Sequence, residues 1–388
     1  MTNYPTYKLG EIAESAKGKK PKSVTKEKTY SFAIPYVDIK AFEKGIIDNY
    51  TDGENCIFCK PGDVLIVWDG ARCGFVGRGV EGAIGSTLAK ISSEKYTNDF
   101  LFYFLQSKYK ILNSNPRGVG IPHIEPNLLW NFEIPDIAPT TQHAIVTRIE
   151  TLFAELDKGV EKLKTAQQQL KVYRQAVLND CLTKGSEKWE NVKLGEVAEK
   201  IQIGPFGTQL HKSDYIEGGI PLINPMHISD RKIFPDNSFS VSTAKYKELE
   251  NYYLSTNDVI LGRRGEMGRC AVVSENENGM LCGTGSLFIR GGKNLYAKYL
   301  CYLLSSQRII AYFENSSSGT TMSNLNRGIV ENTEIPLPSL PTQQRIVQEI
   351  ETRLSACDVM EKNINESLQQ AEALRQSILK NAFSGELV

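Results

Sequence analysis

Three arginines set among glycines are the residues whose possible chemistry is clearest. The run GRRGEMGR at 262–269 follows a hydrophobic stretch and contains Arg263, Arg264 and Arg269. Closely spaced glycines let a backbone approach a ligand, and a guanidinium can donate two hydrogen bonds to O6 and N7 of guanine. A hairpin turn with exposed charges explains the same residues, but we favour contact with DNA. Arg72 is the expected positional counterpart in the first half of the chain.

Lysines are concentrated near the start of the chain. Residues 17–28 contain six lysines and one glutamate, and we name Lys19, Lys20 and Lys22 as candidate phosphate contacts. A run of like charge is also typical of a solvated surface, so both interpretations stay open.

Three segments rich in glycine, proline or serine offer further polar groups. Their hydroxyls, amides and imidazoles can bind phosphate or base edges. The candidates are Arg117 and His123 in 117–123, Thr208, His211 and Lys212 in 204–212, and Thr320, Thr321 and Asn324 in 316–324. Ordinary surface turns have the same composition, and a lone histidine is more often structural.

Motifs for catalysis, cofactors and metals are missing or incomplete. The sequence has no GxxxxGK[ST] loop for ATP, and the Asn-Pro pairs at Asn115 and Asn224 lack the second proline of an amino-methyltransferase motif. Cys56 and Cys59 form half of a zinc signature with no second pair at metal-binding spacing. We therefore expect no catalytic residue, no bound cofactor and no metal site in this chain.

The composition is that of a globular protein of 388 residues, long enough for two or three domains. The net charge is zero, whereas nucleic-acid binders usually carry a basic excess. No apolar run could span a membrane, and the N-terminal residues lack a signal-peptide core. The eight cysteines have no repeated spacing, so we expect a reduced, cytoplasmic location.

One long amphipathic segment occurs twice, at 139–185 and 341–388. Residues 145–182 align with 346–383 at a shift of 201 without a gap, and 11 of the 38 pairs are identical. Apolar residues recur with a period of about 3.5, which predicts two long helices, each roughly 40 residues and about 60 Å. We expect the two helices to pack against each other along apolar seams that include Tyr173, Met360 and Leu374.

The segments that precede the two helices also repeat each other. YKLGEIAE at Tyr7 matches VKLGEVAE at Val192, and FLFYFLQSKYKI matches YLCYLLSSQRII at a shift of 199. Strand-like and helix-like stretches mix irregularly, which predicts an α+β fold. We divide the chain into a globular domain at 1–138, a helix at 139–185, a second globular domain at 186–340 and a second helix at 341–388, a pseudo-twofold internal repeat.

This order of segments resembles the DNA-specificity (S) subunit of type I restriction–modification enzymes. The resemblance rests on the paired KLGE(I/V)AE motifs, the IP…P(T)xQ starts of the helices and LRQSILKNAFSGELV at the C-terminus. In that family each globular domain is a target-recognition domain that reads half of a bipartite DNA site. The two helices pack antiparallel, separate the domains and carry the modification subunits.

The resemblance implies a non-catalytic subunit that binds double-stranded DNA and scaffolds its partners. These are methyltransferase (M) subunits, expected to number two, and restriction (R) subunits; S-adenosylmethionine and ATP would bind to the partners. The alternative is a scaffold that does not bind DNA and carries two binding globules on a coiled-coil strut. Neutral net charge favours the scaffold, whereas the paired lysine and arginine loops oppose it.

Overall fold

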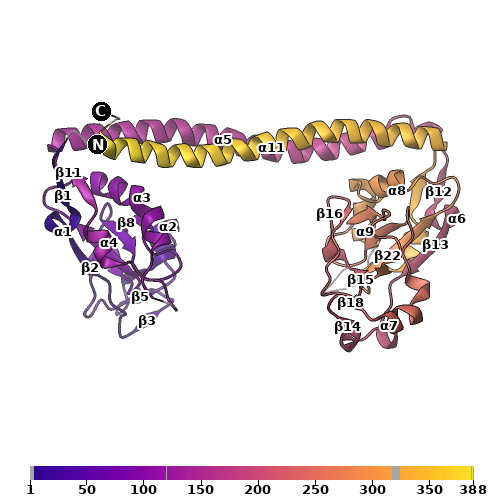
Figure 1. Cartoon of the computed structure of the whole chain (residues 1–388), viewed down its shortest axis with the longest axis horizontal. Coiled ribbons are helices and arrows are strands. Elements are labelled where there is room, and N and C mark those ends of the chain that lie inside the picture. The colour runs from indigo at the N-terminus through magenta and orange to yellow at the C-terminus, as the bar shows by residue number, and fades with distance from the viewer. Residues whose placement is uncertain (1–3, 119, 317–323, 386, 388) are drawn as a thin grey trace. The chain divides into compact units, whose positions relative to one another are not determined.

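The chain divides into two compact units, each containing part of two long helices. The computed structural model describes residues 4–118, 120–316, 324–385 and 387. The first unit comprises residues 1–164 and 365–388, and the second comprises residues 165–364. The helices α5 (Pro139–Thr183) and α11 (Leu340–Ser384) each have 45 residues and contribute to both units (Figure 1). The predicted limits, which place whole helices between the globular domains, stay a prediction.

The described residues of the first unit form three sheets and four short or medium helices beside the long ones, so it has the expected α+β character. Its central antiparallel sheet has the order β2-β10-β7-β8, a second sheet has the order β3-β5-β4-β9-β6, and β1 pairs with β11. The strands are β1 (Thr6–Lys8), β2 (Glu14–Lys17), β3 (Val24–Thr25), β4 (Ile34–Val37), β5 (Tyr50–Thr51), β6 (Phe58–Cys59), β7 (Val64–Val67), β8 (Val76–Arg78), β9 (Gly82–Ile84), β10 (Leu88–Ser92) and β11 (Glu133–Pro135). The helices are α1 (Leu9–Ile12), α2 (Ile39–Lys44), α3 (Asn98–Ser114) and α4 (Pro126–Trp130).

The second unit repeats this plan. Its central sheet has the order β13-β22-β19-β20, a second sheet has the order β14-β18-β15-β21, and two further pairs are β12-β23 and β16-β17. The strands are β12 (Asn191–Lys193), β13 (Ala198–Ile203), β14 (Tyr215–Ile216), β15 (Ile220–Ile223), β16 (Ile228–Ser229), β17 (Lys232–Ile233), β18 (Ser240–Val241), β19 (Val259–Gly262), β20 (Cys270–Val272), β21 (Leu281–Cys282), β22 (Ser286–Gly291) and β23 (Glu334–Pro336). The α-helices are α6 (Leu194–Val197), α7 (Thr243–Glu248), α8 (Ala297–Leu304), α9 (Gln307–Ser316) and α10 (Arg327–Glu331). The 3-10 turns are η1 (Ser186–Lys188), η2 (Gly207–Gln209), η3 (Lys212–Asp214), η4 (Pro225–His227) and η5 (Glu250–Tyr252).

The repeated KLGE motif forms the same short helix at the start of each unit. Leu9 is fully buried, and Glu11 accepts a hydrogen bond of 3.0 Å from the backbone N–H three residues before it. A β-carbon on Gly10 would lie 3.1 Å from the Cβ atom of Trp130 in α4, so a larger residue would crowd this contact. Residues 193–196 repeat the buried leucine, the capping glutamate and the crowded glycine. Each position of the motif therefore has a packing or capping role.

The core of the first unit is completed by the start of α5 and the end of α11. Ile149 of α5 and Leu379 and Phe383 of α11 are buried in one hydrophobic cluster with the side chains of the globular part. Phe383 packs edge-on against Phe100 and Phe104 of α3, with ring centroids 5.2 and 5.4 Å apart. The apolar residues Ile378, Leu379, Ala382 and Phe383 of the C-terminal signature are therefore part of the first unit's core.

The second unit uses the same helix positions with the two helices exchanged. Ile346 and Ile350 near the start of α11, and Val177 and Leu182 near the end of α5, are buried in its core. Each of these residues lies 201 positions from its counterpart in the other helix. The start of one copy therefore always packs with the end of the other, which makes the helices antiparallel in each unit.

A repeated ion pair joins the paired helices. Arg375 pairs with Asp157 in the first unit, and Arg174 pairs with Asp358 at 2.6 Å in the second. The two arginines, like the two aspartates, are related by the shift of 201 residues. Exposed pairs of this kind contribute little free energy, but they favour this register over a shifted one.

The predicted seam is wrong at Tyr173, Met360 and Leu374, whose side chains are about half exposed (48%, 55% and 51%). A straight α-helix drifts by about 20° per heptad from a strict 3.5-residue pattern, so ten successive seam positions cannot stay on one face without supercoiling. A single partner helix also covers only a narrow stripe. Among the described residues, no helix is both long and apolar enough to cross a membrane.

A buried glutamine anchors the start of each long helix. Gln343 is fully buried; its Nε2 donates to the backbone oxygens of Asn294 and Pro338, both at 2.8 Å, and its Oε1 accepts from the N–H of Tyr296 at 2.8 Å. Gln142 makes the same three bonds in the first unit. This residue is the Q of the P(T)xQ motif.

The Gln343→Leu variant should lower the free energy of unfolding by at least about 2 kcal/mol, because three backbone groups lose a buried partner. Urea denaturation followed by circular dichroism measures the change. The neighbouring Gln344 is exposed, so Gln344→Leu is the matched control and should change stability by no more than about 0.5 kcal/mol. Equal effects of the two substitutions would contradict the anchoring role.

Candidate nucleic-acid interface

The candidate loops of the second unit meet at the end of β19. The N–H of Arg263 donates to the oxygen of Gly285 at 2.9 Å, and the oxygen of Arg263 accepts from Leu325 N–H at 3.0 Å. Arg264 and Asn324 form an isolated bridge beside this point. The arginine run and the segment that resumes at residue 324 therefore lie against each other.

The first unit has the same arrangement with different side chains. Ile124 N–H donates to Trp68 O at 2.9 Å, as Leu325 does to Arg263 in the second unit. Asp69 and His123 form the isolated bridge that corresponds to Arg264 and Asn324. Trp68 is therefore the structural counterpart of Arg263, and Asp69 is the counterpart of Arg264.

The expected equivalence of Arg72 with these arginines is wrong. Strand register, rather than residue type, decides which positions correspond, and Arg72 lies three residues beyond Asp69. Its guanidinium makes two hydrogen bonds to Glu43, at 2.8 and 2.9 Å, and lies 4.3 Å from the ring centroid of Phe75. This bidentate bond holds the pKa of Glu43 below its ordinary value. DNA contact by Arg72 stays a prediction.

A second pair of loops begins at the same end of each central sheet. A β-carbon on Gly18 would lie 2.2 Å from Gly85 O, and one on Gly204 would lie 2.0 Å from Gly283 O, so both positions require glycine. The lysine-rich segment after Gly18 and the segment 204–212 are therefore structural counterparts. They start beside Asp69 and Arg263 respectively, so the described parts of the candidate loops of each unit lie at one end of its central sheet.

The predicted residues in these loops are mostly exposed. Lys22 pairs with Glu54 at 3.3 Å, while Arg269 pairs with Glu266 at 2.6 Å and donates to Pro225 O at 3.2 Å. Exposed side chains belong to Lys19, Lys20, Arg117, Thr208, His211, Lys212 and Arg264. Thr320 and Thr321 lie outside the described residues. The assignment of these residues to DNA contact stays a prediction.

His123 is held by a carboxylate that sequence reasoning missed. Its Nδ1 lies 2.7 Å from Asp69 Oδ1, and Lys17 Nζ lies 2.8 Å from Asp69 Oδ2. Burial raises the pKa of Asp69, but the hydrogen bonds from Lys17 and His123 outweigh burial and leave this pKa below its ordinary value. The signal available in the sequence was position: Asp69 follows its strand at the same distance as Arg264.

Arg263 is buried, with 8% of its surface exposed. Its Nε donates to Leu325 O at 2.7 Å. Burial, together with the positive charge of Arg264, lowers the pKa of its guanidinium. Two neighbouring atoms, Asn324 Oδ1 and Ser286 Oγ, are buried without a hydrogen-bond partner. Two buried polar atoms near the end of β19 therefore lack a hydrogen-bond partner among the described protein atoms.

The cysteines of the half zinc signature lie apart from these loops. Cys59 is buried, and its thiol donates to Val80 O at 2.9 Å. Burial raises the pKa of Cys59 to about 11, which opposes the thiolate form that metal binding requires. Cys56 is partly exposed and its pKa is also raised by burial.

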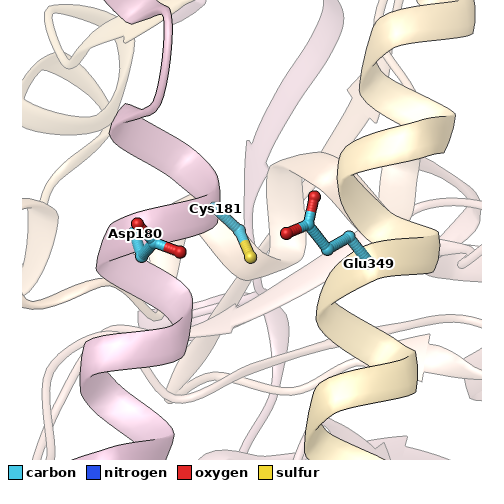
Figure 2. A group of neighbouring side chains, drawn as sticks. All are labelled: Asp180, Cys181 and Glu349. Atoms are coloured by element: carbon cyan, nitrogen blue, oxygen red, sulfur yellow. The ribbon is translucent and has the colours of Figure 1, made fainter.

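Another group with metal-ligand side chains lies between the helices of the second unit. Asp180 and Cys181 of α5 face Glu349 of α11, with ligand atoms within 4.8 Å of one another (Figure 2). Arg353 already occupies this group, because its Nη1 donates to Asp180 at 2.6 Å and lies 3.7 Å from Glu349. The Arg353 bond lowers the pKa of Asp180, while burial raises the pKa of Cys181. The side chains suit an arginine better than a metal ion.

Comparison with known families matches both halves of the chain. The model of the type I restriction modification DNA specificity domain matches residues 1–165 and again residues 186–370. The chain belongs to this family. The repeat seen in the sequence and in the two units is thus a repeat of the family's own domain.

Curated relatives and solved structures resemble the whole chain. The chain is 24% identical to the type I restriction enzyme MjaVIII specificity subunit of Methanocaldococcus jannaschii, over 99% of this chain and 93% of that protein. It is 25% identical to the EcoBI specificity subunit of Escherichia coli, over 91% of this chain and 80% of that protein.

The solved structures confirm the fold class predicted from the sequence. The HsdS subunit of Thermoanaerobacter tengcongensis matches with a TM-score of 0.56 and 20% identity, over 99% of this chain and 97% of that chain. A chain from a structure on complex assembly and conformational transition of the type I R-M system matches with a TM-score of 0.73 and 20% identity, over 99% and 98%.

Removing the carboxylate of Asp69 should change the tautomer of His123. The 2.7 Å contact places the proton of neutral His123 on Nδ1, because Nδ1 must donate to the carboxylate. In Asp69→Ala the proton should move mainly to Nε2, the form that an unconstrained imidazole prefers. Ring nitrogen-15 chemical shifts of histidine-labelled protein above neutral pH measure this change. Lys17→Met leaves the carboxylate of Asp69 in place and should keep the Nδ1 proton; unchanged shifts in Asp69→Ala would contradict the assigned contact.

Proposed function

We propose that this chain reads DNA sequence as the specificity subunit of a type I restriction–modification complex, with one half-site for each unit. The observation that carries the proposal is the end of the central sheet, which is built twice on the same backbone plan with different polar side chains. Asp69 and His123 occupy this place in the first unit, and Arg264 and Asn324 occupy it in the second. Two domains that each recognise a different half-site require this combination of a shared backbone arrangement and different surface side chains.

Chemistry on the DNA belongs, in this proposal, to partner subunits. Methyltransferase subunits, two in number, would bind S-adenosylmethionine and flip the target base, and restriction subunits would bind ATP and cut. The paired halves of α5 and α11 offer rigid surfaces on which such partners can assemble. A protein that works on chromosomal DNA in this way belongs in the cytoplasm of a prokaryotic cell.

A scaffold that does not bind DNA is the competing function. It is supported by the net charge of zero. The residues after β19 argue against this scaffold function. Arg263 is buried and the next residue, Arg264, is exposed, an arrangement that a purely structural turn does not need. Co-purification with the products of neighbouring genes, followed by methylation sequencing of host DNA, distinguishes the two.

The purified chain alone should neither methylate nor cut DNA, because the sequence lacks the motifs for binding S-adenosylmethionine or ATP. Transfer of a labelled methyl group to host DNA, and agarose-gel cleavage of the same DNA, measure the two activities. The reconstituted complex with its methyltransferase subunit is the positive control. Methyl transfer by the pure chain above a no-protein control would overturn this assignment.

Replacement of residues 186–340 by the same segment of another family member should change one half-site and leave the other intact. Each unit has its own core and its own polar sheet end, so each recognition surface is built by one unit. Methylation sequencing of cells that carry the exchanged chain gives both half-sites at once. Exchange of residues 1–138 is the reciprocal control and should change only the other half-site. A change of both half-sites in either exchange would refute independent reading.

A further inference from the structure

Arg263 differs from the other cations of the protein in having deep burial without a carboxylate. Among the described residues it is the only arginine or lysine whose side chain is buried. Partly buried arginines elsewhere have acidic partners, such as Arg290 with Asp258 at 2.8 Å and Arg174 with Asp358 at 2.6 Å. Taking a guanidinium even partly out of water without a counter-charge costs free energy. Such a group requires an explanation, and a ligand that supplies acceptors is one.

The guanidinium is held in one orientation. Nε is used by Leu325 O at 2.7 Å, so the two Nη groups form the remaining donor edge. In the described part of the chain, the Nε bond is the only side-chain hydrogen bond of Arg263, and neither Nη atom is among the buried atoms without a partner, so the Nη edge is open to solvent. The N–H bond of Arg263 to Gly285 and the bond from Leu325 fix the backbone from which the side chain projects. The donor edge is therefore prearranged before any ligand binds.

We infer that Arg263 is the residue of the second unit that reads a guanine, through paired hydrogen bonds to O6 and N7. This inference rests on the proposed function and deepens it. A guanidinium edge matches two adjacent acceptors, and guanine presents such a pair, O6 and N7, in the major groove. Adenine has an amino donor in place of the O6 acceptor, so it cannot accept both hydrogen bonds. Arg264, on the same turn, is exposed and is better placed to contact a phosphate group. Such a contact needs a positive charge but no fixed orientation of the guanidinium.

The first unit lacks this reader. At the position of Arg263 it has Trp68, and the neighbouring place holds Asp69 with His123 instead of Arg264 with Asn324. An anionic carboxylate with an imidazole favours amino groups of bases rather than the acceptor pair of guanine. The guanine requirement carried by Arg263 therefore belongs to one half-site only, and the two half-sites should differ at the corresponding place.

The test uses the full chain assembled with its methyltransferase subunit and the methylation pattern of host DNA. Arg263→Lys keeps the charge but loses the paired donors, and Arg263→Met keeps most of the stem without charge. Both variants should accept other bases at one guanine of the half-site assigned to the second unit by domain exchange. The preference for guanine there should fall by roughly 5- to 150-fold, the range expected for one bidentate contact. Arg308→Met changes an exposed arginine of α9 and should leave the target unchanged.

Four outcomes would overturn the inference. A wild-type half-site without guanine, or an unchanged preference in both variants, would show that Arg263 reads no guanine. An equal loss on all sequences in Arg263→Met, with full function in Arg263→Lys, would place Arg263 on a phosphate. Loss of the assembled complex in both variants would make its role structural. Failure of the proposed function looks different, because then the wild-type complex itself would show no sequence-specific methylation.

Discussion

Burial of the apolar faces of α5 and α11 is the constraint on which the rest of the structure depends. Neither face can be covered by its own globular segment alone, so each unit takes the start of one helix and the end of the other. Phe383, near the C-terminus, therefore packs against Phe100 and Phe104 in a core that begins at Leu9. The first unit cannot be complete until the last helix has been made. Its loops are positioned by a core that both ends of the chain build.

Duplication of one sequence accounts for this crossed arrangement without any special device. In an antiparallel pair of repeated helices, the residue numbers of facing residues add to a constant. The Asp157–Arg375 and Arg174–Asp358 ion pairs are therefore the same interaction, repeated by the duplication. Gln142 and Gln343 are repeated in the same way. The side-chain hydrogen bonds of each glutamine hold the start of a long helix against its own unit. Interior roles of this kind leave little freedom for change.

The ends of the central sheets are under no such constraint, and the two units differ there. Backbone hydrogen bonds hold the loops in the same places, while the side chains change from Trp68 and Asp69 to Arg263 and Arg264. Recognition surfaces placed on loops of a rigid frame can vary without disturbing the core. The net charge is zero because basic and acidic residues are equally numerous, and some cations, such as Lys17 and Arg72, are paired with carboxylates of the same unit.

The sequence by itself determined the repeat, the α+β class and the two long helices, predicted at 139–185 and 341–388 and found at Pro139–Thr183 and Leu340–Ser384. These features depend on local periodicity and on similarity between segments, which a linear sequence records directly. It also pointed to loops that do gather at one end of each sheet. The side-chain roles within those loops were beyond its reach.

Only the tertiary structure decided that Trp68, rather than Arg72, corresponds to Arg263. It also decided that Asp69 binds both His123 and Lys17, and that Arg263 is buried while Arg264 is exposed. It also turned Tyr173 and Met360 away from the predicted seam. Each of these facts depends on strand register, or on helix rotation relative to a partner far away in the chain. A shift of one residue reverses the direction of a side chain in a strand, so composition and spacing cannot specify such contacts.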